Sequence, residues 1–188
     1  MDNRGATFIP MRVVVSIIVG AAIVALAFIG LQNAMKISAE KQVERECDKL
    51  IISISTMVAS GDARDVNNPQ DTISHTRGIT FNFPNKLVYF GLGIDPDPHN
   101  NGNLESGLTD NGSCIFYKIK GMSKKVIWLD DNIKFREGME EGGRWVINGP
   151  EQGFVIKGGG KYKLTLELVE DVYKIKYVLV LADDGMDV

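Results

Sequence analysis

The sequence VVVSIIVGAAIVALAFIGL, from Val13 to Leu31, decides the fold of this chain. It contains no charged residue, and Ser16 is its one weakly polar side chain. At about 1.5 Å per residue in a helix, the run spans close to the ~30 Å of a bilayer's hydrocarbon core, whereas the apolar part of a secretory signal is usually about 7 to 15 residues. A buried helix of a soluble core is the alternative, but such a helix rarely lacks charges on every face. The sequence therefore predicts one transmembrane helix over residues 13–31.

An amphipathic pattern follows the apolar run almost without a break. Its apolar residues recur at spacings of mostly three or four, which places them on one stripe of a helix. The stripe consists of Ile37, Val43, Cys47, Leu50, Ile51, Ile54, Met57 and Val58. Gly61 readily closes a helix, and Asn67-Asn68-Pro69 does not easily continue one. We therefore expect a stalk helix over residues 32–60, continuous with the transmembrane helix from near Met11, and a linker over residues 61–76.

From residue 77 the pattern changes from a helical to a strand-like period. Short runs rich in β-branched and aromatic residues are separated by Gly, Asn, Asp and Pro. From Lys161 to Leu168 every second residue is apolar, as in an antiparallel sheet that is buried on one face. Strands flank Gly158-Gly159-Gly160, so we interpret this stretch as a hairpin turn and not as a phosphate-binding loop. The expected strands are residues 79–83, 86–94, 114–120, 125–129, 144–147, 153–157, 162–168 and 173–181.

These patterns predict an α+β fold, in which a long amino-terminal transmembrane-plus-stalk helix is followed by an antiparallel β-sandwich-like head. The head, of about 106 residues, is long enough for a core of its own. Trp128 and Trp145 fall within strand patterns, so we expect both in that core. The expected divisions are an amino-terminal leader (1–12), a transmembrane helix (13–31), a stalk helix (32–60), a linker (61–76), a β-rich head (77–182) and an acidic tail (183–188).

Composition argues against several classes of function. Charged residues make up 24% of the chain, the net charge is -3, and no basic stripe is available for nucleic acid. The two cysteines and the two histidines, His75 and His99, lack the spacing of a zinc site. No acid, base and nucleophile lie at catalytic spacing. We therefore expect neither a nucleic-acid partner nor an enzymatic activity.

Basic residues flank the apolar run on both sides. Arg4 and Arg12 precede it, and several lysines and an arginine follow within about 20 residues, from Lys36 to Lys49. We give the second group less weight because acidic residues interleave with it on the amphipathic helix, whereas Arg12 abuts the membrane directly. The expected topology is a single-pass membrane protein with a cytoplasmic amino terminus and an extracytoplasmic head.

Three side chains are candidates for covalent modification. Cys47 lies on the apolar stripe, and Cys114 begins a strand that can cover that stripe. An even cysteine count in an extracytoplasmic domain favours a disulfide between them, with two buried free thiols as the alternative. Asn111-Gly112-Ser113 is an N-glycosylation acceptor sequence in a polar turn, although chance alone often yields such tripeptides.

The most specific chemical prediction is a structural calcium site in the loop over residues 94–105. Calcium needs several oxygen atoms, and loops supply them with acidic or amide side chains at every second position and a glycine that turns the chain. The expected ligands are Asp95, Asp97, Asn101, Asn103 and Glu105. The alternative is a solvated turn rich in Pro, Asn and Asp, which forms without a metal.

The leader supplies a resemblance at the residue level. Arg4-Gly5 before Ala6-Thr7-Phe8-Ile9, with the apolar helix and the β-rich head that follow, resembles class III signal sequences and the lollipop architecture of type IV pilins and archaeal pilin-like proteins. The resemblance implies cleavage after Gly5 by a prepilin peptidase, and a helix that is first a membrane anchor and then the core of a filament. Pro10 departs from the family, because bacterial pilins carry a glutamate there. The chain is also similar to single-pass proteins of methanogenic archaea with the same stalk and head.

We therefore expect a non-enzymatic, membrane-anchored, pilin-like surface protein for filament assembly, adhesion or cell-envelope interaction. Its expected partners are the lipid bilayer and, through the amino-terminal helix, further copies or other pilin-like subunits. The alternative is a membrane-anchored ligand-binding or sensor domain that recognises a sugar, a peptide or a component of the cell envelope.

Overall fold

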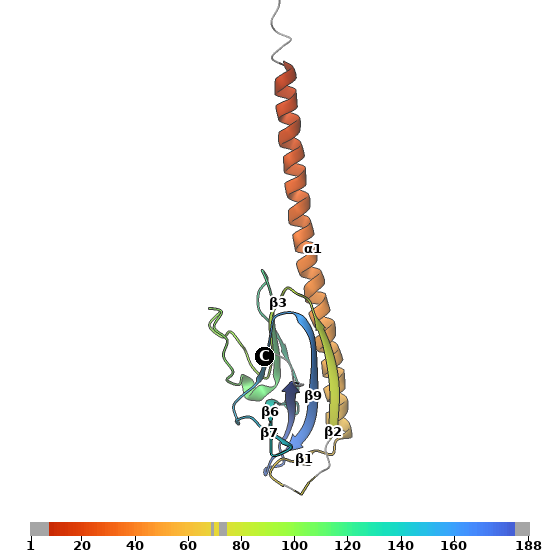
Figure 1. Ribbon diagram of the computed structural model, residues 1–188, viewed down its shortest axis with the longest axis vertical. Helices are drawn as coiled ribbons and strands as arrows, with labels where there is room; N and C mark the ends of the chain where they lie inside the picture. The colour runs from red at the N-terminus through yellow and green to blue at the C-terminus, as the bar shows by residue number, and fades with distance from the viewer. Residues whose placement is uncertain (1–7, 69, 72–74, 183–188) are drawn as a thin grey trace, which may run out of the picture. The chain divides into compact units, whose positions relative to one another are not determined.

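The computed structural model describes residues 8–68, 70–71 and 75–182 (Figure 1). The chain divides into two compact units, Met1–Ser38 and Ala39–Val188. A single helix, α1 (Phe8–Ser60), contributes residues to both units. The helix ends at Ser60 as predicted, and it begins a few residues earlier than expected. A Cβ atom on Gly61 would lie 2.9 Å from the carbonyl oxygen of Val58, so a glycine suits the close approach at this helix end.

The first unit presents an apolar surface that no other described residue covers. α1 is long and apolar enough to cross a membrane, and its large apolar side chains from Met11 to Ile37 are exposed. The expected transmembrane helix is therefore present as a helix of suitable length and composition. Exposed apolar side chains on this scale are unusual on a water-facing surface.

The second unit contains two β-sheets. The larger sheet has six strands in the order β1-β9-β10-β6-β7, and β2 also pairs with β9. Its strands are β1 (Arg64–Asp65), β2 (His75–Phe83), β6 (Phe135–Glu141), β7 (Arg144–Ile147), β9 (Gly160–Glu170) and β10 (Lys176–Ala182). The smaller sheet has four strands in the order β5-β4-β3-β8. Its strands are β3 (Leu87–Leu92), β4 (Cys114–Ile119), β5 (Lys125–Trp128) and β8 (Phe154–Lys157), and a short 3-10 turn, η1 (Asp110–Gly112), precedes β4.

The α+β class is confirmed, but the expectation of a purely antiparallel head is wrong. β10 pairs with β6 in parallel, and β1 pairs with β9 in parallel, so the larger sheet is mixed. The sequence pattern misses β6, because its residues include Arg136, Glu137, Glu140 and Glu141 and do not alternate cleanly. β1 lies inside the expected linker, where two residues are too few to give a pattern.

One hydrophobic core joins the second half of α1 to both sheets. The apolar stripe of α1 supplies Val43, Cys47, Leu50, Ile54 and Met57, all of which are fully buried. These side chains belong to one cluster with inward-facing residues of the strands, including stacked and tilted phenylalanine rings on β2 and β3. The helical period therefore predicted the buried face correctly within the second unit.

α1 also covers one edge of β2, which among the described strands pairs only with β9. Gln42 donates a hydrogen bond to the carbonyl oxygen of Asn82 at 2.7 Å, and Lys49 donates one to that of Thr80 at 2.6 Å. Unpaired strand edges are sites of unwanted strand addition unless another element covers them. Figure 1 shows β2 running alongside α1 over the length of the strand.

The predicted disulfide is absent, because Cys47 and Cys114 are both free and buried. Successive side chains of a strand point to opposite faces of the sheet. On β4, Ile115 and Tyr117 face the core that contains Cys47, so Cys114 faces the other way. Its thiol donates a weak hydrogen bond to the carbonyl oxygen of Thr109 at 3.5 Å. The alternative of two buried thiols is therefore the correct one for this structure.

Two further expectations are wrong. Gly158-Gly159-Gly160 is not a hairpin turn, because it joins β8 of the smaller sheet to β9 of the larger sheet. A Cβ atom on Gly159 would lie 2.1 Å from the carbonyl oxygen of Pro84, so this crossing requires glycine.

Trp128 is 57% exposed on the edge strand β5 rather than buried. Trp145 is half-buried against a small cluster that includes Leu179 and Leu181.

Candidate functional site

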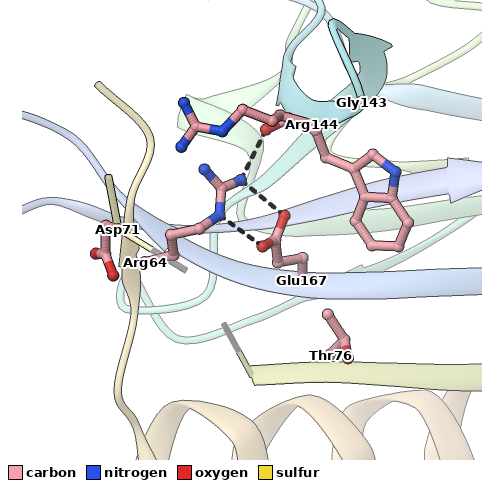
Figure 2. Close-up of a pocket in the computed structure, with 7 residues that line it drawn as sticks. Arg64, Asp71, Thr76, Gly143, Arg144 and Glu167 are labelled. Atoms are coloured by element: carbon pink, nitrogen blue, oxygen red, sulfur yellow. Dashed lines mark hydrogen bonds and ion pairs between the residues drawn. The ribbon is translucent and has the colours of Figure 1, made fainter. Parts of the chain in front are cut away.

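The second unit has a pocket of about 330 Å³ on the outer face of the larger sheet (Figure 2). On β9, Leu166 and Leu168 face the core, so Glu167 between them faces outward and forms part of the pocket floor. The lining residues come from segments that are far apart in the sequence. They are Arg64, Asp71, Thr76, Gly143, Arg144, Trp145 and Glu167.

A buried ion pair between Arg64 and Glu167 holds the pocket together. Nε of Arg64 donates to Oε1 of Glu167 at 2.7 Å, and Nη2 donates to Oε2 at 2.9 Å, so the contact is bidentate. Nη2 also donates to the carbonyl oxygen of Trp145 at 2.7 Å. Arg64 is 5% exposed and Glu167 is 3% exposed. The hydrogen-bonded Glu167 carboxylate raises the pKa of Arg64, against the lowering effect of burial, so the guanidinium stays charged.

A tight turn places Arg144 at the pocket. Gly142 and Gly143 have φ angles of 60° and 77°, and Glu141 pairs with Arg144 across them. A two-residue turn with positive φ at both positions suits the twist of a hairpin, and glycine adopts it without a steric cost. Arg144 is the first residue of β7, and its Nη2 donates to the carbonyl oxygen of Asn68 at 2.9 Å.

The remaining side chains give the pocket both a negative and a neutral polar group. Oδ2 of Asp71 accepts a hydrogen bond from the backbone N–H of Asp65 at 2.8 Å. Thr76 lies on β2 directly opposite Glu167 on β9. Figure 2 shows Arg64 joined to Glu167, with the guanidinium of Arg144 above that of Arg64 in this view.

This arrangement is suited to binding. Among the described lining residues, two guanidinium groups, two carboxylates and the hydroxyl group of Thr76 supply hydrogen-bond donors and acceptors. Two arginines in one pocket favour recognition of a planar anion. Sequence reasoning missed this site, because Arg64 and Glu167 are separated by 103 residues. The one available signal was Gly142-Gly143, which is typical of a two-residue hairpin.

The loop of the predicted calcium site is ordered around Asp97, which is 1% exposed. Its Oδ1 accepts hydrogen bonds from the backbone N–H groups of Asn101 at 2.8 Å and Gly102 at 3.2 Å, and its Oδ2 lies 3.3 Å from Nζ of Lys118. Burial alone would raise the pKa of Asp97, but these backbone hydrogen bonds and the lysine together lower it. The carboxylate is therefore ionised and already hydrogen-bonded.

The other expected calcium ligands do not converge on Asp97. Asp95 forms an ion pair with Lys124, and Oδ1 of Asn101 accepts from the backbone N–H of Asn103 at 2.8 Å. Glu105 is exposed, with its Oε1 3.7 Å from Nε2 of His99. Across the described residues, no group of three or more His, Cys, Asp or Glu side chains is placed to hold a metal ion. Two lysine ammonium groups lie beside the carboxylates that the prediction assigned to calcium, and the calcium site stays a prediction.

The remaining sequence-predicted sites have different outcomes. Arg4, Gly5 and Ala6 of the expected peptidase site lie outside the described residues. Asn111 is exposed in η1, and its backbone carbonyl accepts a hydrogen bond from Arg136 at 2.9 Å. An exposed asparagine satisfies the access that glycosylation needs, and the modification stays a prediction.

Comparisons of this chain with models of protein families, with curated protein sequences and with solved structures found no match. The candidate sites are therefore interpreted from their own residues.

Proposed function

We propose that this chain is a non-enzymatic, pilin-like surface protein for filament assembly, adhesion or cell-envelope interaction. The first part of α1 serves as the membrane anchor or the assembly helix, and the second unit contacts partners. One observation carries the proposal. Residues 13–31 of α1 are apolar on every face, and no residue of the membrane-spanning window of this helix is buried inside the structure.

The physical reason is the cost of leaving this surface in water. Each Å² of apolar surface that is removed from water contributes roughly 25 cal/mol. Lipid tails or further copies of the same helix can both remove this apolar surface from water, since both are apolar. Arg12, at the amino-terminal edge of the run, is placed to reach lipid headgroups through its flexible side chain.

The proposed topology places the amino terminus in the cytoplasm and the second unit outside it. The resemblance of Arg4-Gly5 to a prepilin peptidase site supports this orientation and a mature chain that begins at Ala6. Mass mapping of the native protein tests the cleavage. A native chain that begins at Met1 or Asp2 would contradict the cleavage and leave the anchor intact.

Charge substitutions on one helix test the anchor. Ile23→Lys together with Leu26→Lys places two ammonium groups in the apolar run, each at a cost of about 2.5–3.5 kcal/mol for a position near the bilayer centre. We expect this variant to leave the membrane fraction on alkaline carbonate washing, while the unaltered chain stays in it. Ile52→Lys is the matched control, because Ile52 is 68% exposed on the second half of the same helix. Retention of both variants in the membrane, or loss of the unaltered chain from it, would contradict the proposal.

The pocket on the larger sheet favours a second candidate function. Two arginines, a threonine and two carboxylates line one concave site, which is the arrangement expected of a ligand-binding or sensor domain. Such a role is compatible with the same membrane anchor.

A further inference from the structure

The pocket holds hydrogen-bond donors that the protein itself does not use. Within the described residues, Nη1 of Arg64 and both Nε and Nη1 of Arg144 donate to no protein atom. Neither arginine has a nitrogen that is fully buried without a partner, so these donors reach solvent through the pocket that both residues line. Guanidinium groups bind carboxylates through parallel N–H···O bonds, which fixes the orientation of a planar anion.

The charges of the pocket select a ligand with one negative charge. Arg64 already neutralises Glu167, whereas Arg144 forms no ion pair with a carboxylate in the described part of the chain. A monoanion supplies the missing partner of Arg144. A dianion, such as a phosphate monoester, would bring a second negative charge that no further cationic side chain among the described lining residues balances.

The volume of the pocket and its neutral polar side chain, Thr76, restrict the class of ligand further. A volume of about 330 Å³ is at the lower end of the range for small-ligand pockets, so it suits a single ring. Thr76 offers a hydroxyl group, which both donates and accepts hydrogen bonds. We infer that this pocket binds a carboxylated sugar, such as a uronic acid residue of an acidic glycan, with its carboxylate on Arg144 and Arg64 and its hydroxyl groups toward Thr76. The inference concerns the second unit alone and does not depend on where the amino-terminal helix resides.

Calorimetric titration of the full chain in detergent micelles tests the inference with three probes. Sodium glucuronate carries one carboxylate, glucose has the same ring without it, and glucose 6-phosphate replaces it with a dianion. We expect glucuronate to bind, and glucose and glucose 6-phosphate to bind at least about 10-fold more weakly, since a charge-assisted hydrogen bond contributes about 1.5–3 kcal/mol. Absence of glucuronate binding, or equal binding of either other probe, would overturn the inference.

Amino-acid substitutions test whether glucuronate binds in this pocket. Arg144→Gln should weaken glucuronate binding by about 10-fold or more, and Arg144→Lys by less, because lysine keeps the charge but not the planar fork. Arg45→Gln is the matched control, since Arg45 is exposed on α1 and away from the pocket lining. Thr76→Val alters an exposed side chain and should weaken binding several-fold without affecting the fold. Thermal unfolding of each variant identifies any misfolded protein, and unchanged binding by folded Arg144→Gln and Thr76→Val proteins would refute the assignment.

Discussion

Replacement of Glu167 by glutamine removes the charge that neutralises Arg64 in the larger sheet. The two side chains are only 7% and 4% exposed, so water does not replace the lost partner. Breaking a buried ion pair by removing one member costs about 3–5 kcal/mol, because the other charge is left buried. The glutamine keeps one acceptor for the guanidinium, and the carbonyl oxygen of Trp145 keeps another. For a domain of this size, 1 kcal/mol corresponds to about 2–4 °C in Tm, so Glu167→Gln should lower Tm by about 6 to 20 °C.

Circular dichroism of the full chain in detergent micelles measures this change through the β-sheet signal of the second unit. Glu140→Gln is the control, because Glu140 is exposed and its loss should change the free energy of unfolding by no more than about 0.5 kcal/mol. The double variant Arg64→Met with Glu167→Leu should recover most of the lost stability, because it removes both buried charges together. A Tm for Glu167→Gln within about 2 °C of the unaltered protein would refute this reasoning.

Three further predictions concern the core, the thiols and the acidic loop. Leu50→Ala, at a fully buried position, should lower the free energy of unfolding in urea by about 2–5 kcal/mol. Ile52→Ala, on the exposed side of the same helix, should lower it by no more than about 0.5 kcal/mol. Equal effects of the two substitutions would contradict the packing. Burial raises the pKa of both Cys47 and Cys114 to about 12, so their contribution to stability is complete below pH 9.0 and is lost as the pH rises through about 12. Native protein should therefore resist iodoacetamide at pH 8 until urea unfolds it, and rapid alkylation of folded protein would count against burial. If the loop binds calcium, millimolar calcium should raise Tm in the unaltered protein and not in Asp97→Ala; an unchanged Tm in both excludes the site.

The elements with a strong period could be predicted from the sequence. The apolar stripe of α1 follows helical spacing from Val43 to Met57, and its members are buried because the second unit packs on that face. β7 has the predicted bounds of residues 144–147, and β2, β4, β5 and β9 overlap their predicted ranges. These segments are rich in β-branched and aromatic residues, so local propensity and tertiary packing favour the same conformation.

The pairing of distant segments could not be predicted from local pattern. The spacing of apolar residues along the chain predicts neither the parallel pairing of β10 with β6 nor the face of β4 on which Cys114 lies. Both depend on how the sheets assemble. The glycines at 158–160 mark a connection, but not whether it returns to the same sheet. The ion pair of Arg64 and Glu167 left no signal, since each residue alone reads as a charged surface position.

Protease accessibility in intact cells tests the central claim most directly, which is that the first part of α1 anchors an extracytoplasmic second unit. Protease is added to intact and to lysed cells, and the membrane-retained fragments are identified by mass. We expect protease to remove residues 77–182 from intact cells and to leave a membrane-embedded fragment that contains residues 13–31. Protection of residues 77–182 in intact cells, with digestion only after lysis, would contradict the proposed orientation, and the absence of any membrane-retained fragment would contradict the anchor.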